Sequence, residues 1–471
     1  MGLAWRTWIT SAPALLLSTA LARADLPPVA SVSGTDVTLV HVGPTLAAAL
    51  ASGSVAWRSL ATTNVSPGPR WLVFPVPIGT KAVLVPVCAG RARVLLDDAP
   101  VMTAPGPVVV DVPRDGGEHR VAILVSVSGY EHRIACGDAP RLGTRAAARD
   151  GLLVMTFEST HAGPDAGAAV VYVPPRHDVR RPATLLVGLH PWNGGIWTYA
   201  AYDALLDAAR AADVVLLLPS GLGNSLYTAE AEDEVLEALH ALGESIVVDP
   251  DRVTLFGASM GGAGATTIGF HHPDRFAGIV SFFGDSRYDL TTYVHAILRD
   301  PAAAHAVNAL DIVDNARNVP VWLVHGDDDQ VSPPAQSVVL ARALAARHFA
   351  VTFDRVPHAG HEGRIVSLLA GRIVDVAAHA RRAVAPPRVS YWSVRRKDDE
   401  AYGIRWERSG AGDVFFDLER RADTLHLVEA RGVRSLTIPR GAFGFSPTDT
   451  PPALCDDAAA RAVAVTWDAA R

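Results

Sequence analysis

The sequence predicts an α/β fold, in which helices cover both faces of a mostly parallel sheet and a β-rich segment flanks it on either side. Short apolar strands alternate with helix-length amphipathic stretches in residues 151–385, and strands that are apolar on both faces are typical of parallel sheets. Residues 25–150 and 386–471 instead contain short β-branched runs separated by Gly, Pro and Asp. We therefore expect an N-terminal β-sandwich-like domain and a small C-terminal β-rich domain.

Length and composition limit the classes of protein to consider. A chain of 471 residues is expected to form two or three domains. Hydrophobic residues make up 49% and charged residues 19%, which indicates a folded globular protein. The net charge of −7 gives no electrostatic footprint for nucleic acid, so we expect no such partner. The oligomeric state is left open.

Residues 1–24 have the pattern of an export signal. A short apolar stretch follows an arginine near the start, and Ala22-Arg23-Ala24 forms an A-x-A cleavage site. A membrane anchor is the alternative, but Pro13 and several Ser and Thr residues interrupt the stretch, which is short for spanning a bilayer. We expect cleavage after Ala24, a secreted or periplasmic protein, and no membrane span after cleavage.

The chain has three cysteines. Cys88 and Cys136 both precede residue 150. An oxidising compartment would allow them to form a disulfide, although two buried thiols fit the sequence equally well. Cys455 is left over near the carboxyl terminus. No Cys/His cluster has the spacing of a zinc site, and we expect neither a metal nor a cofactor.

The N-terminal segment is expected to be strand-like throughout and to form a β-sandwich. Its clearest strands are "KAVLVPVCA", "ARVLLDD", "GPVVVDVP" and "HRVAILVSVSGYEHRI".

The central segment supplies the strands of the predicted, mostly parallel sheet. They are, in order, "AVVYVP", "TLLVGLH", "VVLLLPS", "RVTLFG", "GIVSFF", "VPVWLVHG" and "AVTFDRV". Between them, "AEAEDEVLEALHALG" is expected to be a helix, because Val235, Leu236, Leu239 and Leu242 fall on one face. Gly243 stands where a helix stop is expected.

The C-terminal segment follows a Pro-containing joint, "AVAPPRVSYW", near residue 385. Its predicted strands are "AYGIRWERSG", "DVFFDLERRADTLHLVEA" and "RSLTIPRGA".

One strand-to-helix turn carries a serine flanked by glycines. Gly257-Ala258-Ser259-Met260-Gly261 fits G-x-S-x-G, follows the strand "RVTLFG" and opens "MGGAGATTIGFHH", a helix whose first residues are small. Such a turn holds a strained serine above the edge of a sheet, beside a helix amino terminus that favours developing negative charge. This context favours Ser259 as a nucleophile over an ordinary turn that happens to contain serine.

A serine hydroxyl needs a base to take its proton and an acid to orient that base. In this fold the acid and then the histidine should follow the serine. The candidate acids after the strand "VPVWLVHG" are Asp327, Asp328 and Asp329. Asp285, in "FFGDSRYD", is the main rival acid, and the candidate bases are His358 and His361. The alternative for each is a turn, cap or packing role.

The serine turn, "HGDDDQVSPP" and "HAGHEG" together resemble the prolyl-oligopeptidase-like serine hydrolases and the related secreted esterases, including polyhydroxybutyrate-depolymerase-like and feruloyl-esterase-like enzymes. The resemblance covers roughly residues 160–380 and implies an α/β-hydrolase fold with a catalytic triad. The family motif H-G-x-x-D-x-x-V-P places its acid at Asp329, and the family Gly-His pair places the base at His361. This chain reads Val331-Ser332-Pro333 where the family has Val-Pro.

Acyl transfer also needs two backbone N–H groups for the developing oxyanion. Met260, directly after the nucleophile, is expected to supply one, and the loop "LHPWNGG" the other. The family usually has His-Gly in this loop, whereas this chain has His190-Pro191. Because proline has no N–H, we expect Trp192 to be the second donor, with packing over the site as its alternative role.

These residues predict a serine hydrolase that forms an acyl-enzyme, and a carboxylic-ester hydrolase is favoured. Prolyl oligopeptidases carry a β-propeller, which needs four to eight blades of about 40 to 45 residues each. The segment before residue 150 is too short for one and shows no repeat, so we expect a small-molecule or polymeric ester as substrate. The alternatives are a peptidase without a propeller and a non-catalytic binding protein on a hydrolase shell, against which the intact Ser, Asp and His argue.

Overall fold

A computed structural model gives the fold of the chain. The residues that it describes are 39–53, 55–56, 68–78, 82–85, 93–102, 108–113, 115–127, 141–143, 152–157, 159–160, 167–196, 198–288, 298, 300–447, 452–456 and 463–468. The predicted signal peptide, Cys88 and Cys136 lie outside them, so the cleavage site and the disulfide stay predictions. The chain divides into two compact units. The first unit comprises Met1–Arg181, Trp192–Ser225 and Ala229–Ile246. The second unit comprises Pro182–Pro191, Leu226–Thr228 and Val247–Arg471.

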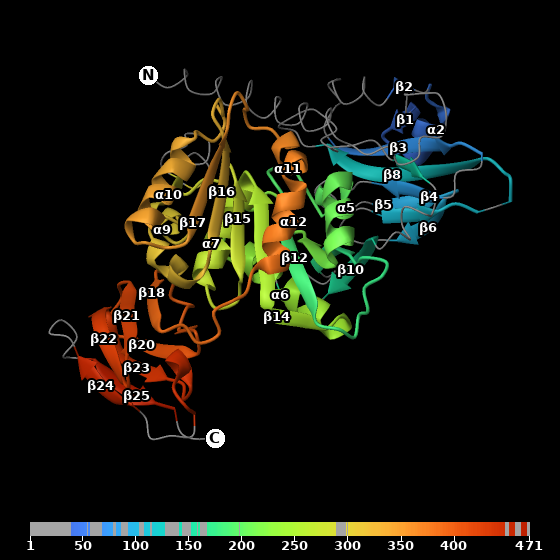
Figure 1. The fold of residues 1–471 in the computed structure, drawn as a ribbon. Helices are drawn as coiled ribbons and strands as arrows, with labels where there is room; N and C mark the ends of the chain where they lie inside the picture. The colour runs from blue at the N-terminus through green and yellow to red at the C-terminus, as the bar shows by residue number, and fades with distance from the viewer. Residues whose placement is uncertain are drawn as a thin grey trace, which may run out of the picture. The chain divides into compact units, whose positions relative to one another are not determined.

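The first unit begins with two antiparallel sheets (Figure 1). The larger has the order β2-β1-β3-β8-β5-β6, and its two longest strands, β3 and β8, pair along their whole length. The smaller has the order β7-β4-β9. The strands are β1 Leu39–Gly43, β2 Val55–Ala56, β3 Gly68–Val76, β4 Ala82–Val85, β5 Arg93–Leu96, β6 Ala99–Met102, β7 Val108–Asp111, β8 His119–Val127 and β9 Arg141–Gly143. The four strands expected here are all present, while the domain boundary at residue 150 stays a prediction.

One part of this segment is a helix, so the prediction of strand throughout residues 25–150 was wrong there. Helix α2 spans Leu46–Ala51. Its alanine-rich sequence favours a helix, and the Thr45 side chain accepts a hydrogen bond from Ala48 N at its start. Local helix propensity and this cap outweigh the β pattern of the flanking residues.

The first unit also contains β10 (Leu152–Phe157), β11 (Gly167–Tyr172) and β13 (Val214–Pro219), which pair antiparallel in the order β10-β11-β13. Besides α2, the helices described in this unit are the short η2 (Tyr199–Ala201), α5 (Asp203–Ala212) and α6 (Glu230–Ser245). Helix α6 confirms the predicted helix but runs past Gly243, so the predicted stop was wrong. The helix ends where Ile246 N donates to Leu242 O, and a glycine in the last turn does not by itself terminate a helix.

The buried face of α6 also differs from the apolar pattern. Val235 and Leu242 are buried as expected, whereas Leu236 and Leu239 are only half-buried. Glu234 is fully buried and accepts hydrogen bonds from Ser220 Oγ (2.7 Å) and Gly221 N (2.9 Å). Burial raises the pKa of the Glu234 carboxyl to about 7, against the lowering effect of these two bonds. The spacing of apolar residues along a helix does not reveal a buried carboxyl group that bonds to the backbone.

The second unit contains the parallel strands of the predicted sheet. They are β12 (Ala183–Leu189), β14 (Val248–Ala258), β15 (Gly278–Phe282), β16 (Val321–Gly326) and β17 (Val351–Val356). They pair in parallel in the order β12-β14-β15-β16-β17. Strands β12, β15 and β16 are buried along their whole length, which confirms the expected parallel strands that are covered on both faces.

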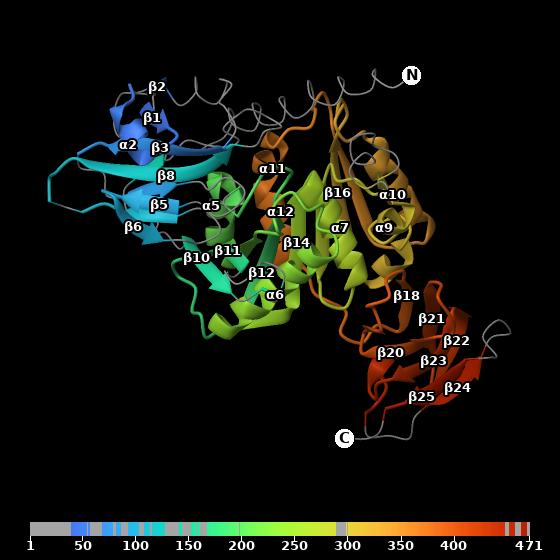
Figure 2. The same cartoon turned by 180° about the vertical axis from the view of Figure 1, so that it is seen from behind.

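Helices of this unit cover both faces of these strands. In Figure 1, α12 (Ala370–His379) lies in front of the strands, and in Figure 2, seen from behind, α7 (Met260–His271) does. The other helices among the described residues of the parallel segment are α9 (Pro301–His305), η4 (Val313–Asn318), α10 (Ala335–Ala346) and α11 (Arg364–Leu368). The fold is therefore α/β, as predicted.

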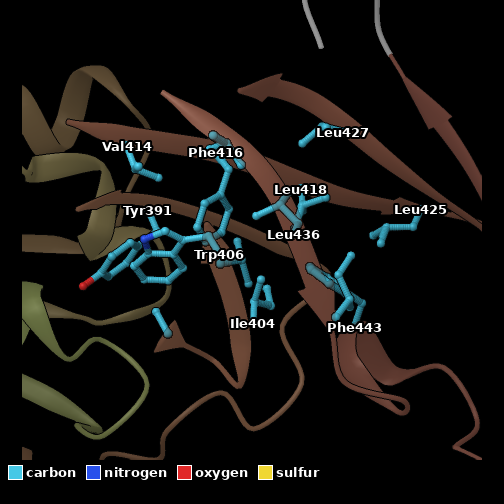
Figure 3. Packing of buried hydrophobic residues seen from close by; sticks show 14 residues of the cluster. Tyr391, Ile404, Trp406, Val414, Phe416, Leu418, Leu425, Leu427, Leu436 and Phe443 are labelled. Carbon is cyan, nitrogen blue, oxygen red and sulfur yellow. The ribbon is translucent and has the colours of Figure 1, made fainter. Parts of the chain in front are cut away.

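The chain ends in two four-stranded sheets, with the orders β18-β21-β22-β24 and β19-β20-β23-β25. Figure 3 shows the side chains of Tyr391, Trp406 and Phe416 packed together in their common core. The elements are β18 Arg388–Ser393, β19 Glu400–Ala401, β20 Ile404–Arg408, β21 Val414–Arg421, β22 Thr424–Arg431, β23 Val433–Ile438, η5 Ala442–Gly444, β24 Ala453–Asp456 and β25 Ala464–Trp467. Cys455 is exposed as a free thiol. Within the described ranges, no helix is both long and apolar enough to cross a membrane.

Candidate active site

Ser259 occupies the sharp turn between β14 and α7. Its backbone has φ 57° and ψ −121°, a region that non-glycine residues rarely adopt and that costs about 1–3 kcal/mol. Hydrogen bonds hold the turn on both sides, because Ser259 N donates to Phe282 O (2.9 Å) and Ala263 N donates to Ser259 O (3.0 Å). The surrounding structure therefore fixes a strained serine at the carboxyl edge of the parallel strands.

The two glycines of G-x-S-x-G are required by close backbone contacts. A Cβ on Gly261 would lie 1.8 Å from Leu189 O, and a Cβ on Gly257 would lie 2.2 Å from Gly261 O. Neither contact involves a side chain that could move aside. The small residues thus let α7 approach the end of β12 closely, as the sequence pattern requires.

His361 lies in the loop after β17 and connects the serine to a carboxylate. Its Nε2 is 2.7 Å from Ser259 Oγ, and its Nδ1 is 2.7 Å from Asp329 Oδ2. An ionised carboxylate only accepts hydrogen bonds, so Nδ1 carries the proton and Nε2 is left to accept from the serine hydroxyl. The ring of Phe283 packs on the imidazole, with 4.5 Å between the ring centroids.

Asp329 is buried in the loop after β16 and has several donors. Its Oδ1 accepts from Val331 N (2.8 Å) and Ser332 N (3.0 Å), and its Oδ2 also lies 3.4 Å from His325 Nε2. Burial raises the pKa of this carboxyl, but hydrogen bonds from His325 and His361 lower it more strongly, to about 2. Asp329 is therefore ionised at neutral pH.

The other candidate acids and the second histidine lie elsewhere. Asp327 pairs with Arg355 at 2.6 Å. Asp328 and His358 both point to solvent, and the His358 side chain is 95% exposed. Asp285 is buried and accepts a hydrogen bond from Ser332 Oγ at 2.8 Å. The structure thus brings together Ser259, His361 and Asp329. The three other aspartates and His358 take no part in the hydrogen bonds that connect these three residues.

The two expected oxyanion donors fall in different units. Met260 is the first residue of α7 and is buried in the second unit, where Gly261 packs against the carbonyls of Leu189 and His190. Trp192 begins a stretch of the first unit. The pairing of Met260 with Trp192 stays a prediction.

Two side chains, one beside Asp329 and one beside His361, were not predicted from the sequence. His325 is fully buried, and its Nε2 donates to Ser332 O at 2.8 Å while its Nδ1 accepts from Ser337 Oγ at 2.8 Å. Phe283 packs beside the His361 ring. Their position at the carboxyl ends of β16 and β15 is a signal that could have indicated both, and His325 is also the histidine of the motif H-G-x-x-D. In the part of the chain that the structure describes, no group of His, Cys, Asp and Glu could hold a metal ion.

Comparison with known proteins gives one family match. Residues 223–374 match the model of the Prolyl oligopeptidase family, a segment that includes Ser259, Asp329 and His361. No curated protein matches the chain.

Several solved structures are similar to about half of the chain. An S-formylglutathione hydrolase from Agrobacterium tumefaciens is 19% identical, with a TM-score of 0.44 over 49% of this chain and 96% of its own. A fluorophosphonate-binding serine hydrolase of Staphylococcus aureus is 16% identical, with a TM-score of 0.43 over 48% of this chain and 98% of its own. A ferulic acid esterase is 17% identical, with a TM-score of 0.42 over 48% and 97%.

The family match therefore agrees with two features of the structure, the parallel strands and the strained serine turn. Together they indicate a serine hydrolase of the α/β-hydrolase fold, in which residues 223–374 are similar to the Prolyl oligopeptidase family.

Proposed function

We propose that this protein hydrolyses carboxylic esters with Ser259 as nucleophile, His361 as general base and Asp329 as the acid that orients it. One observation carries the proposal. Asp329 Oδ2, both ring nitrogens of His361 and Ser259 Oγ form an unbroken line of two 2.7 Å hydrogen bonds. This is the arrangement that activates a serine hydroxyl.

In the first half of the reaction, Ser259 Oγ attacks the ester carbonyl while His361 Nε2 takes the hydroxyl proton. The imidazolium that forms is stabilised by the Asp329 carboxylate, whose pKa of about 2 keeps it ionised. The tetrahedral intermediate collapses when the alcohol oxygen leaves with the proton from His361. The acyl group then remains on Ser259.

In the second half, a water molecule takes the place of the alcohol. His361 Nε2 removes a proton from the water, which attacks the acyl-enzyme, and Ser259 recovers that proton as the carboxylic acid leaves. The Met260 and Trp192 N–H groups are the proposed donors to the oxyanion in both steps.

An ester substrate is favoured over a peptide by what precedes the catalytic segment. The described strands before residue 150 form a six-stranded and a three-stranded sheet, unlike the repeated four-stranded blades of a propeller that gates access to peptides. A peptidase without a propeller is the second candidate, and the match to the Prolyl oligopeptidase family supports it. The predicted signal in residues 1–24 supports export to the periplasm or the medium.

The test compares two substrate panels on the purified protein. Short-chain p-nitrophenyl esters report ester cleavage, and Pro- and Ala-p-nitroanilides report peptidase activity. Ser259→Ala removes the proposed nucleophile, whereas Ser286→Ala is the matched control, because Ser286 is an equally buried serine whose hydroxyl donates to Gln336 O at 2.7 Å. We expect ester turnover that Ser259→Ala abolishes and Ser286→Ala retains, with inert anilides.

Other outcomes have definite meanings. Anilide turnover of similar efficiency would transfer the assignment to the peptidase. Ester turnover that survives Ser259→Ala, or no labelling of Ser259 by a fluorophosphonate probe, would refute the proposed triad.

A further inference from the structure

Ser332 links the loop that carries Asp329 to a second buried carboxylate. The residue is 1% exposed, and all three of its polar groups are engaged. Its N–H donates to Asp329 Oδ1 (3.0 Å), its carbonyl accepts from His325 Nε2 (2.8 Å), and its Oγ donates to Asp285 Oδ1 (2.8 Å). One residue therefore contacts both the proposed acid and two buried polar side chains behind it.

Asp285 belongs to a short loop that also supports the base. Phe283, at the start of this loop, packs its ring 4.5 Å from the centroid of the His361 ring. The loop backbone is fixed at both ends, because Phe283 N donates to Val324 O (2.7 Å) and Ser286 N donates to Gln336 Oε1 (2.9 Å). The loop after β15 thus offers a rigid acceptor, Asp285, to the loop after β16.

The hydroxyl of Ser332 donates the hydrogen bond that connects the loop after β16 to Asp285. A buried carboxylate needs hydrogen-bond donors, so the bond from Ser332 Oγ is costly to lose. The same bond restrains the rotation of the Ser332 backbone, and with it the N–H that points at Asp329. Residues 331–333 are where this chain departs from the family motif, whose valine has no hydroxyl to donate.

We propose that Ser332 is a positioning residue of the proposed triad. By binding Asp285 it fixes the N–H that holds Asp329, and it acts on Ser259 only through Asp329 and His361. This inference rests on the proposed function.

The experiment measures kcat and KM of the full-length protein on p-nitrophenyl acetate. Ser332→Ala keeps the backbone groups but removes the anchor, so we expect kcat to fall about tenfold with KM within about twofold of wild type. Ser390→Ala is the matched control, since it removes the hydroxyl of an equally buried serine in β18, which donates to Asp314 O at 2.8 Å, and should leave kcat unchanged. Asp285→Ala removes the acceptor and should reproduce the loss caused by Ser332→Ala.

A second background separates positioning from general destabilisation. With Asp329→Asn already present, the carboxylate that Ser332 positions is gone, so Ser332→Ala should cost less than about twofold more. The same tenfold loss in that background would overturn the proposal, as would unchanged kcat in Ser332→Ala or, if that variant does not fold, in Asp285→Ala. Activity that survives Ser259→Ala would instead show that the proposed triad itself is wrong.

Discussion

The charge of Asp329 is the property of a single residue on which the proposed mechanism depends most directly. Asp329→Asn keeps the shape of the side chain but allows an amide N–H to face His361 Nδ1, which favours the tautomer that cannot accept the serine proton. We expect kcat on p-nitrophenyl acetate to fall by about 10³- to 10⁴-fold, with little change in KM. Asp328→Asn is the control, because that neighbour is 66% exposed and should have no effect. A loss smaller than about tenfold in Asp329→Asn would contradict the role of the carboxylate.

At the same scale, the line from Ser259 to His361 and Asp329 could be proposed from short motifs, because each residue follows a recognisable strand. The choice of Asp329 over its two neighbours rested on the family motif alone. The bond between Ser332 and Asp285 could not be predicted, since 47 residues separate them and neither carries a local signal. The alignment of the ends of β15 and β16 determines which hydrogen-bond donor faces each carboxylate.

At the scale of elements, the strands of the parallel sheet were predictable because they are continuous apolar runs, and α7 because its small residues follow the serine turn. Helix α2 was not predicted, since six residues are too few for a hydrophobic period to show. The end of α6 was misplaced because a glycine inside the last turn has the same sequence signal as a glycine beyond it. Patterns therefore fixed the kinds of element in the catalytic segment better than their ends.

Because α7 lies close to β12, alanine substitutions at two helical glycines should have opposite effects on stability. In Gly261→Ala the new Cβ would lie 1.8 Å from Leu189 O, whereas Gly371, in α12, has nothing within 4 Å of its Cβ position. We expect Gly261→Ala to lower the free energy of unfolding by about 3 kcal/mol or more, and Gly371→Ala to raise it by about 0.5–1 kcal/mol. Urea denaturation measures both. A Gly261→Ala protein as stable as wild type would mean that α7 and β12 are not packed this closely.

Within the second unit, the C-terminal sheets are fastened to the catalytic segment through η4. Asn315 is fully buried, and its amide donates to Phe270 O and Trp392 O (2.9 Å each) while accepting from Trp392 N (2.6 Å). Tyr391 Oη donates to His271 O, the last residue of α7, at 2.9 Å. The helix that begins beside Ser259 is thus held at its far end by β18. The C-terminal sheets are therefore joined to the catalytic segment by buried hydrogen bonds.

His305 should make the stability of the folded protein depend on pH, because it lies where the C-terminal sheets attach. Its ring lies between Asp311 Oδ2 (3.0 Å) and Asp413 Oδ2 (2.9 Å), the latter directly before β21. Burial lowers the pKa of this imidazole, but hydrogen bonds to Asp413 and Asp311 raise it above its usual 6.5. Because the folded-state pKa is raised, the stabilisation is complete below about pH 6.5 and is lost as pH rises through the folded-state value.

We therefore expect Tm to fall less between pH 6 and pH 9 in His305→Gln than in wild type. The effect should correspond to less than about 1 kcal/mol, because the ring is partly exposed and solvent screens the pair. His240→Gln is the matched control, since that side chain is 84% exposed and lies 3.9 Å from Glu244. Thermal unfolding of all three proteins at both pH values decides the matter: an equal fall in wild type and His305→Gln would show that His305 does not couple α9 to the C-terminal sheets.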